Sequence, residues 1–570
     1  MSRSTRGARA GRSPATRDTT SSDRSDSDRA RRHGASVRRR AALAYQRTAW
    51  HRDHRFALAA IVVSTALVVA IGFLGPSAVT LTLGPRNSFL PPWYLPAAVW
   101  EQLFWGWLVD PPTRPDSGPQ PTEWLVSVAI WLAIAIGGLG LFIGQRALAD
   151  GWRPNPRRLF VFGTVLSTVT ALVPPLTSAD VLMYAAYGRL QRIGISPYDI
   201  TPAEVFRSQY DPVLYWTERP WQDTPSVYGP ITSWSQLAAN HLGGENMHNI
   251  VFWLQVFALL PFIATCAGVV WLAHGDPTRQ ARATLFSISN PLLIWAVVAG
   301  AHNEALSVMF AVFGLMMMRK SPLLAGLAIG LAGCAKLSIG LYGLAMLWAY
   351  RREPKKAALL CLGAAVPMGL AYVVWEPTAF FQVLRNGGYV SVGSWANPLF
   401  RLLDLFMTGT QAKVVVGVLA YVLLIAFVWM LSQVVPWTPA PGLLSGQDLR
   451  HDPLTIALRT ALVLSVAWLV TSMYTLSWYD LIAWAPLAVL AATRLDWLFV
   501  LRGVFLSMAY VPGRSIDIAH QWLEATASRA RDTVSPIVQF FVIGAIVHWW
   551  WTDRKRHRSV DPDREVAAAR

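Results

Sequence analysis

Long apolar runs recur along this 570-residue chain, and they constrain its fold more than any other feature. A helix crosses a bilayer with about 20 apolar residues, and in lipid only helices and closed barrels satisfy their backbone polar groups. We therefore predict an all-α polytopic membrane protein with about 14 spans, in a range of 12–14. Two spans share the stretch 322–350, and the others are placed at 56–75, 124–144, 159–175, 249–273, 283–300, 305–318, 357–375, 413–433, 457–475, 481–493, 497–512 and 536–552.

Composition supports this interpretation and removes several other classes of protein. Apolar residues make up 53% of the chain and charged residues 15%, whereas soluble proteins carry about 25% charged residues. The 27 tryptophans are typical of helices that end at a bilayer interface. All three cysteines, Cys266, Cys334 and Cys361, lie in apolar runs, where a thiol packs as a small hydrophobic group. An ordinary soluble enzyme, a fully disordered chain and a disulfide scaffold are therefore excluded.

The net charge of +17 is concentrated near the amino terminus. Residues 1–55 contain fifteen arginines and five aspartates, which accounts for ten of the seventeen charges. This segment has too few apolar residues to form a core, so we predict a disordered, Arg-rich cytoplasmic tail. A basic cytoplasmic tail is also predicted at 553–570, with the membrane domain at 56–552 between them. Because no folded module or interleaved aromatic residues accompany the arginines, no nucleic-acid partner is expected.

Basic residues in the short loops predict which side of the membrane each loop faces. With the amino terminus inside, every predicted inside loop carries arginine or lysine, and both termini are cytoplasmic. The extracytoplasmic face then receives the longer connections, at 76–123, 176–248, 376–412 and 513–535. We expect an ordered layer of loops there, with membrane lipids as partners around the helices. No inverted repeat typical of transporters is visible in the sequence.

Asp180 follows the third predicted span and is the most informative polar residue near a membrane face. An ionisable residue at this depth is costly, which makes it a functional candidate. A carboxylate at the outer rim of the bilayer suits a base that accepts a proton from a sugar hydroxyl. The helix after it carries Tyr184 and Arg189. The alternative is structural, since Ser178 or Asp180 could simply cap that helix.

Two further polar features fall on the same predicted face. His302, Asn303 and Glu304 occupy one tight turn between apolar helices, where a buried, satisfied histidine is the ordinary alternative. Lys336 lies between two short glycine-rich spans, so it must reach the interface or meet an anion such as a lipid-linked phosphate. Arg385 in the loop 376–412 could serve the same phosphate or face solvent. No second histidine or carboxylate stands at metal-ligand spacing, so no metal is expected.

Aromatic residues near these polar groups offer flat faces on which a sugar ring could stack. Trp221 and Tyr228 flank a turn in the loop 176–248, next to Asp223. Trp478 and Tyr479 occupy another predicted outside turn. An interfacial aromatic belt is the alternative for all of them. Because five polar features from separate hairpins fall on one leaflet, we predict that Asp180, His302, Glu304, Lys336 and Tyr479 converge on a single site.

An ordered set of short motifs resembles a known family. The set spans roughly residues 170–490 and consists of TSAD at 177–180, ISPY at 195–198, TPSVYGP at 224–230, NP at 290–291, GAHNEAL at 300–306, Lys336, and WY at 478–479 with Pro486. It is similar to GT-C glycosyltransferases, and most closely to the polyprenol-phosphate-mannose-dependent α-1,6-mannosyltransferases of actinobacteria (the MptA/MptB type). Two segments depart from the usual pattern: 181–184 reads VLMY where the family typically reads Asp-Val-Tyr-Ser-Tyr, and Ser477 replaces the proline of a Pro-Trp-Tyr turn.

The resemblance implies a GT-C-type transmembrane helix bundle and an inverting mannosyltransferase at the outer face of the plasma membrane. Its donor would be polyprenyl-phosphate-mannose, and its acceptor an α-1,6-mannan or lipomannan-type cell-envelope glycolipid. Asp180 would be the general base, Lys336, His302 and Arg385 would meet the donor phosphate, and neither a cofactor nor a metal would be required. The implied substrate-binding residues are Tyr184, Arg189, Tyr198, Asp223, Tyr228, Asn303, Glu304, Trp478 and Tyr479.

Three other interpretations remain open from the residues. A carboxylate and a cation do not distinguish mannose from arabinose, so a polyprenyl-phosphate-arabinose-dependent arabinosyltransferase is the first alternative. A lipid-linked glycan transporter is the second, although the charges gather at one face and do not cross the bilayer midplane. A scaffold for envelope synthesis is the third.

Overall fold

The computed structural model describes residues 53–96, 99, 102, 108–110, 120–218, 221–385, 388–441, 448–513 and 518–559. The chain from His54 onward forms one compact unit, and that unit is the one described below. Most of the two predicted tails, 1–55 and 553–570, lies outside the described residues. The domain boundaries therefore stay predictions.

Helices account for nearly all of the regular structure, and the described strands are two short antiparallel ones, Val109–Asp110 (β1) and Gln120–Pro121 (β2). The α-helices are His54–Leu74 (α2), Glu123–Ala149 (α4), Pro156–Thr170 (α5), Asp180–Arg192 (α6), Pro202–Ser208 (α7), Pro230–Gly243 (α8), Met247–Trp271 (α9), Pro277–Phe286 (α10), Pro291–Leu293 (α11), Glu304–Met317 (α12), Pro322–Ala335 (α13), Gly340–Ala349 (α14), Pro354–Gly369 (α15), Pro377–Arg385 (α16), Ala396–Leu403 (α17), Gly409–Val434 (α18), Pro453–Thr471 (α19), Leu481–Val489 (α20), Leu495–Ala509 (α21), Gln521–Arg529 (α22) and Ser535–Ser559 (α23).

Eight helical segments among the described residues are long and apolar enough to cross a membrane, which confirms an all-α polytopic membrane protein. They are His54–Leu74, Glu123–Ala149, Met247–Trp271, Pro277–Val298, Pro354–Trp375, Gly409–Val434, Pro453–Thr471 and Gln521–Arg554. Every one of the fourteen predicted stretches contains helix, but several of these helices are short. The count of fourteen spans therefore stays a prediction.

The shorter helices occur where proline, glycine or a polar residue interrupts an apolar run. The predicted span 283–300 divides at Asn290, whose side chain caps α11 by accepting from the backbone N–H of Leu292 at 3.0 Å. A π-helix, Ile294–Val298, follows it. The stretch 322–350 divides at Lys336, as expected, because α13 ends at Ala335 and a 3₁₀ turn begins at Leu337.

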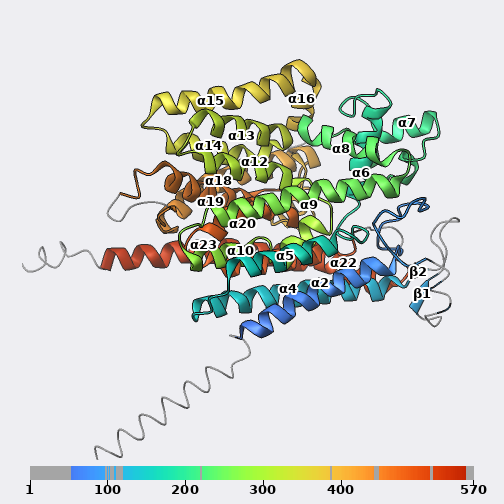
Figure 1. The fold of residues 1–570 in the computed structure, drawn as a ribbon, viewed down its shortest axis with the longest axis horizontal. Coiled ribbons are helices and arrows are strands. Elements are labelled where there is room, and N and C mark those ends of the chain that lie inside the picture. Colours follow the sequence, from blue (N-terminus) through green and yellow to red (C-terminus); the bar gives the residue numbers. More distant parts are fainter. Residues whose placement is uncertain are drawn as a thin grey trace, which may run out of the picture. The chain divides into compact units, whose positions relative to one another are not determined.

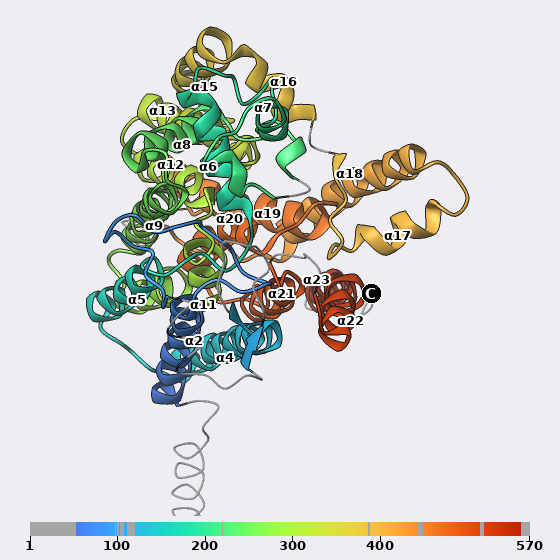
Figure 2. The ribbon, with the colours of Figure 1, turned by 90° about the vertical axis from the view of Figure 1, so that its right-hand side faces the viewer.

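The long helices pack side by side, and the polar helices gather at one end of them. In Figure 1, α6, α7 and α8 lie on the right-hand side, where α6 and α8 pack along α9. Figure 2 views that end directly and shows α6 and α8 beside α9, α12 and α13, while α17 and α18 extend away on the side of α19. The loop 176–248 thus forms a layer over one end of the helix bundle. This end carries the candidate site.

Candidate active site

Asp180 is the first residue of α6, and the turn before it is attached to the segment 294–299. The side chain of Thr177 donates to the Trp295 carbonyl at 3.0 Å, and the Leu176 amide donates to the Ala299 carbonyl at 2.7 Å. Ala179, not Asp180, occupies the N-cap position of α6. The Asp180 carboxylate makes no capping bond there and remains 22% exposed, so it is accessible to a ligand.

His302 lies beneath Asp180 and is completely buried. Its Nδ1 is 3.8 Å from Asp180 Oδ2 and 3.2 Å from the hydroxyl of Tyr184, while its Nε2 lies 3.4 Å from Ser178 Oγ. The imidazole ring stacks on Trp478 with centroids 3.8 Å apart and planes inclined by 13°. These contacts hold the imidazole in one orientation against the carboxylate.

The backbone beside His302 is specialised for this packing. A Cβ atom at Gly300 would stand 2.3 Å from the imidazole ring, so only glycine fits there. Ala301 adopts the left-handed conformation, with φ 52°, which costs a residue with a side chain about 1–2 kcal/mol. The buried methyl group of Ala301 packs in an apolar cluster around α6 and α9, which offsets part of that cost.

Lys336 and Glu304 form an ion pair near Asp180 and His302. Lys336 follows the last residue of α13, and its Nζ contacts Oε1 of Glu304 at the start of α12. The ammonium group also lies 3.8 Å from the centroid of the Tyr479 ring, a cation–π contact. Glu304 is 2% exposed and Lys336 19% exposed, so the lysine presents the accessible side of the pair.

The TPSVYGP motif joins the Asp180 side of the cluster to the Lys336 side. The Gly229 amide donates to the Ala335 carbonyl at 3.2 Å, and a Cβ at Gly229 would stand 2.1 Å from the Cys334 carbonyl oxygen. From the same motif, Tyr228 packs edge-on against Tyr184 with centroids 5.1 Å apart. The Tyr228 hydroxyl lies 3.4 Å from that of Tyr184.

The surroundings of Asp180 raise the pKa of its carboxyl group. Burial, followed by repulsion from Glu304, raises the pKa of Asp180 to about 7, while Lys336 and the hydrogen bond from Ser178 oppose the rise. Burial and the nearby Lys336 charge hold the pKa of His302 well below its usual range. His302 is therefore neutral near pH 7, and its predicted contact with the donor phosphate stays a prediction.

Several predicted site residues make their contacts elsewhere. Arg189 is buried and forms ion pairs with Asp211 at 2.7 Å and Glu245 at 3.0 Å. Asp223 pairs with Arg207 at the surface, at 2.6 Å. For these two residues, the ion pairs provide a structural explanation, and their roles toward a substrate stay predictions.

The remaining predicted residues are placed as follows. The Tyr198 hydroxyl donates to the Tyr228 carbonyl at 2.9 Å and so supports the TPSVYGP motif. Asn303 precedes α12, and its side-chain nitrogen is buried without a hydrogen-bond partner among the described residues. The side chain of Arg385 lies outside the described residues. Its predicted contact with a phosphate stays a prediction.

A second buried ion pair, Asp480 with Arg502, was missed by sequence reasoning. Arg502 Nη2 lies 3.2 Å from Asp480 Oδ1, and both side chains are at most 2% exposed. Burial raises the pKa of Asp480 to about 6, and Arg502 opposes that rise. Two signals could have revealed the pair: an acid directly after Tyr479, and a lone arginine in the apolar run 497–512.

Chemically, the cluster offers a partly exposed carboxylate and a partly exposed ammonium group with aromatic rings around them. The carboxylate titrates near neutrality, so it can accept a proton at physiological pH. The ammonium group can meet an anion, and the rings of Tyr228 and Tyr479 provide apolar faces. Among the described residues, no three histidine, cysteine or carboxylate side chains gather as metal ligands would.

The fold and this cluster define an integral membrane protein with a polar site at one end of its helix bundle. Residues 107–376 match the profile of the MptA/B family, described as the N-terminal domain of alpha-(1->6)-mannopyranosyltransferase. This stretch of the chain is therefore similar to the MptA/B family, in agreement with the resemblance seen in its motifs. The matched region includes Asp180, His302, Glu304 and Lys336, and it ends before Trp478 and Tyr479.

Individual relatives match shorter stretches of the chain. Alpha-(1->6)-mannopyranosyltransferase A of Corynebacterium glutamicum is 27% identical over 215 residues, which cover 35% of this chain and 43% of the relative. An alpha-(1->6)-mannopyranosyltransferase of Mycobacterium tuberculosis is 31% identical over 137 residues, 24% of this chain and 23% of the relative. The matches thus span less than half of these curated relatives. No solved structure matches the chain significantly.

Proposed function

We propose that this protein is an inverting mannosyltransferase that moves mannose from polyprenyl-phosphate-mannose to an α-1,6-mannan or lipomannan-type glycolipid. One observation carries the proposal: Asp180 and Lys336 present an accessible base and an accessible cation within one buried aromatic cluster. The match of residues 107–376 to the MptA/B family profile supports the mannosyl group and the α-1,6 linkage. The membrane-spanning helices support substrates that carry lipids.

The proposed reaction is a single displacement at the anomeric carbon of mannose. The O6 hydroxyl oxygen of the acceptor forms the new bond to C1, and its proton passes to Asp180. The bond between C1 and the phosphate oxygen breaks, and polyprenyl phosphate leaves with the electron pair. Because the hydroxyl attacks opposite the leaving phosphate, a β-linked donor gives an α-glycoside.

Lys336 would meet the phosphate as negative charge develops on it. Its pairing with Glu304 and its contact with the Tyr479 ring fix the ammonium group before the donor arrives, so little reorganisation is needed during the reaction. His302, being neutral, would act through position: it holds Ser178, Asp180 and Tyr184 in one arrangement. Glu304 and Tyr479 would act in the same indirect way on Lys336.

We place the reaction at the extracytoplasmic face of the plasma membrane. The basic loops favour this orientation for the end of the bundle that carries Asp180. Nucleotide sugars are cytoplasmic substrates, so an enzyme on the outer face needs a donor carried by a lipid. A polyprenyl phosphate could keep its chain in the bilayer while its sugar reaches the end of the helices.

The decisive experiment measures transfer of radiolabelled mannose from synthetic polyprenyl-phosphate-mannose to a short α-1,6-mannoside. Membranes would contain the wild type, Asp180→Asn or the control Asp199→Asn, which removes an exposed carboxylate from the same layer of loops. Loss of a general base lowers the rate by about 10²–10⁴-fold, so Asp180→Asn should be nearly inactive and the control active. Full activity of Asp180→Asn would remove Asp180 from the mechanism.

A donor competition assay separates mannose from arabinose transfer. Unlabelled polyprenyl-phosphate-mannose should lower the transfer of labelled mannose, because it competes with the labelled donor. Unlabelled polyprenyl-phosphate-arabinose at the same concentration should leave that transfer unchanged. If the arabinose donor alone supports transfer, the reaction class stands and the sugar in the proposal is wrong. If neither donor supports transfer by folded protein, the glycosyltransferase proposal itself fails.

A further inference from the structure

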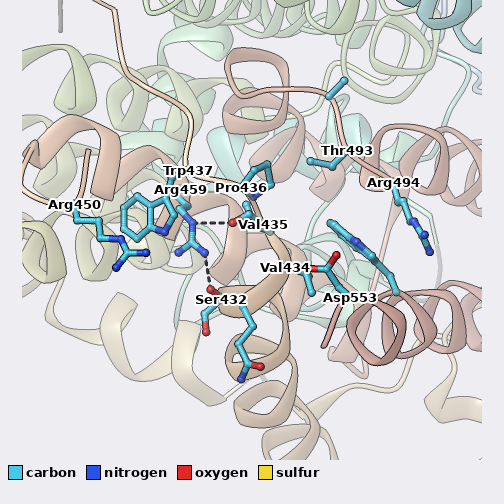
Figure 3. Close-up of a pocket in the computed structure, with 13 residues that line it drawn as sticks. Ser432, Val434, Val435, Pro436, Trp437, Arg450, Arg459, Thr493, Arg494 and Asp553 are labelled. Carbon is cyan, nitrogen blue, oxygen red and sulfur yellow. Dashed lines mark hydrogen bonds between the residues drawn. The ribbon is translucent and has the colours of Figure 1, made fainter. Parts of the chain in front are cut away.

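A basic cavity lies far from the candidate active site, between the ends of four helices. Its volume is about 680 Å³. The end of α18, the first turns of α19, the residues before α21 and the last turns of α23 form its walls (Figure 3). The side chains that matter here are Trp437, Arg450, Arg459, Arg494, Trp549 and Asp553.

Two guanidinium groups share one indole ring in this cavity. Arg459 lies 4.4 Å and Arg450 5.9 Å from the centroid of the Trp437 ring, and Figure 3 shows the three side chains together. Among the described residues, no carboxylate forms an ion pair with Arg450, Arg459 or Arg494. The neighbouring positive charges of Arg450 and Arg459 repel each other, and a bound anion would relieve that repulsion.

Arg459 is held in place by the backbone. Its Nε donates to the Val435 carbonyl at 2.9 Å and its Nη2 to the Ser432 carbonyl at 2.5 Å, both at the end of α18. The side chain is therefore oriented before any ligand binds. The carboxylate near Arg450, that of Asp448, accepts from the Arg450 backbone N–H at 2.9 Å and contacts the His451 ring at 2.8 Å.

The lining retains positive charge when every ionisable side chain in it is counted. Three arginines and Asp553 line the cavity, which gives a net charge of +2. Arg450 and Arg494 are exposed, so their guanidinium groups are accessible to a ligand. Guanidinium groups bind phosphate through paired hydrogen bonds, and they are the preferred side chains for such anions.

We propose that this cavity binds the phosphate group of an anionic membrane lipid. The walls belong to membrane-spanning segments, Gly409–Val434, Pro453–Thr471 and Gln521–Arg554, and the cavity lies at their ends. That level is where lipid headgroups lie, and basic pockets between transmembrane helices are typical binding sites for them. Trp437 and Trp549 suit the same interfacial depth.

The cavity is separate from the candidate active site. Arg459 lies in the second turn of α19, whereas Trp478 follows the end of that helix, and about 18 Å of helix separates Arg459 from Thr471. The proposal does not depend on the transferase function. A lipid at this position would bridge α18, α19 and α23, and should therefore stabilise the protein.

The test uses purified full-length protein in a neutral detergent, titrated with phosphatidylglycerol, phosphatidylcholine or inorganic phosphate. Native mass spectrometry measures bound lipid, and the thermal melting temperature measures stabilisation. The test variant is Arg450→Gln/Arg494→Gln, which leaves the buried Arg459 intact. The control Arg153→Gln/Arg351→Gln removes the same charge from two exposed arginines whose side chains donate to backbone carbonyls at the ends of α4 and α14.

We expect phosphatidylglycerol, but not phosphatidylcholine, to bind and to raise the melting temperature of the wild type and the control. In the test variant, the affinity should fall by about tenfold or more, because each lost charged hydrogen bond weakens binding. Equal phosphatidylglycerol binding by all three proteins, or none, would overturn the proposal. If inorganic phosphate alone stabilises the protein as much as phosphatidylglycerol does, the cavity binds a free anion and the lipid proposal is wrong.

Discussion

At the scale of single residues, the proposed role of Asp180 as general base predicts the pH dependence of the proposed transfer. A general base works only when it is deprotonated, and burial with repulsion from Glu304 raises the pKa of Asp180 to about 7. Transfer should therefore be slow in acid, rise through pH 7 and level off above it. Well below the pKa, the rate should fall by about tenfold per pH unit. A flat profile of kcat/KM between pH 5 and 8 would contradict this assignment.

Two substitutions in the neighbouring ion pair should move that pH profile in opposite directions. Glu304→Gln removes a negative charge that raises the pKa of Asp180, so the acidic limb should shift to lower pH. Lys336→Met removes a positive charge that lowers the same pKa, so the limb should shift to higher pH. Both variants break the Glu304–Lys336 ion pair, so any loss of activity caused by breaking the pair is common to both. If the acidic limb shifts in the same direction in both variants, the charges of Glu304 and Lys336 do not set the pKa of Asp180, and the pair only supports the local structure.

At the scale of elements, Gly229 determines how closely the TPSVYGP motif approaches the end of α13. A methyl group there would stand 2.1 Å from the Cys334 carbonyl oxygen, so Gly229→Ala must push the two segments apart. Overpacking of this kind costs about 1–3 kcal/mol, and it should also separate Tyr228 from the Lys336 turn. We expect a lower melting temperature and reduced transfer activity. Gly544→Ala in α23 is the control, because a Cβ there meets nothing within 4 Å.

The long apolar helices could be predicted from the sequence, but several breaks in the shorter ones could not. Runs such as 56–75 and 413–433 need only apolar length, and they are helical as expected. The division at Lys336 was also expected, from two short glycine-rich runs. The π-helix after Asn290 was not predicted, because its apolar residues are as compatible with an ordinary helix as with a π-helix.

At the scale of the whole molecule, a buried ion pair joins helices that are far apart in the sequence. Arg282 in α10 binds both carboxylate oxygens of Asp496 in α21, at 2.6 and 2.8 Å, and also donates to the carbonyls of Leu487 and Leu490. Asp496→Asn would leave a buried arginine without its counter-ion. Breaking such a pair costs about 3–5 kcal/mol.

The prediction for Asp496→Asn is a clear fall in the melting temperature of the purified protein, with normal transfer per folded molecule. The exposed pair of Lys356 and Glu353 provides the control, since surface ion pairs contribute little. Glu353→Gln should therefore melt like the wild type. If Asp496→Asn and Glu353→Gln melt at the same temperature, the buried pair does not stabilise the fold.

Only part of the candidate site could be predicted from the sequence. That Asp180, His302, Glu304, Lys336 and Tyr479 share one face could be predicted, because each lies in a turn between apolar runs. Which side chains pair within that face could not be predicted. Lys336 pairs with Glu304, and His302 stacks on Trp478. Both contacts depend on distances between helices, which the spacing of residues in the sequence does not encode.

The stacking of His302 on Trp478 also has a consequence for how the protein is made. Ribosomes release a chain from its amino terminus onward, so Asp180, His302 and Lys336 emerge well before the indole on which the imidazole rests. A nascent protein that ends before Trp478 holds Asp180, His302 and Lys336 without that support. The candidate site is therefore complete only late in synthesis, and on the proposed function chains that terminate before Trp478 should not transfer mannose even when their first helices are correctly inserted.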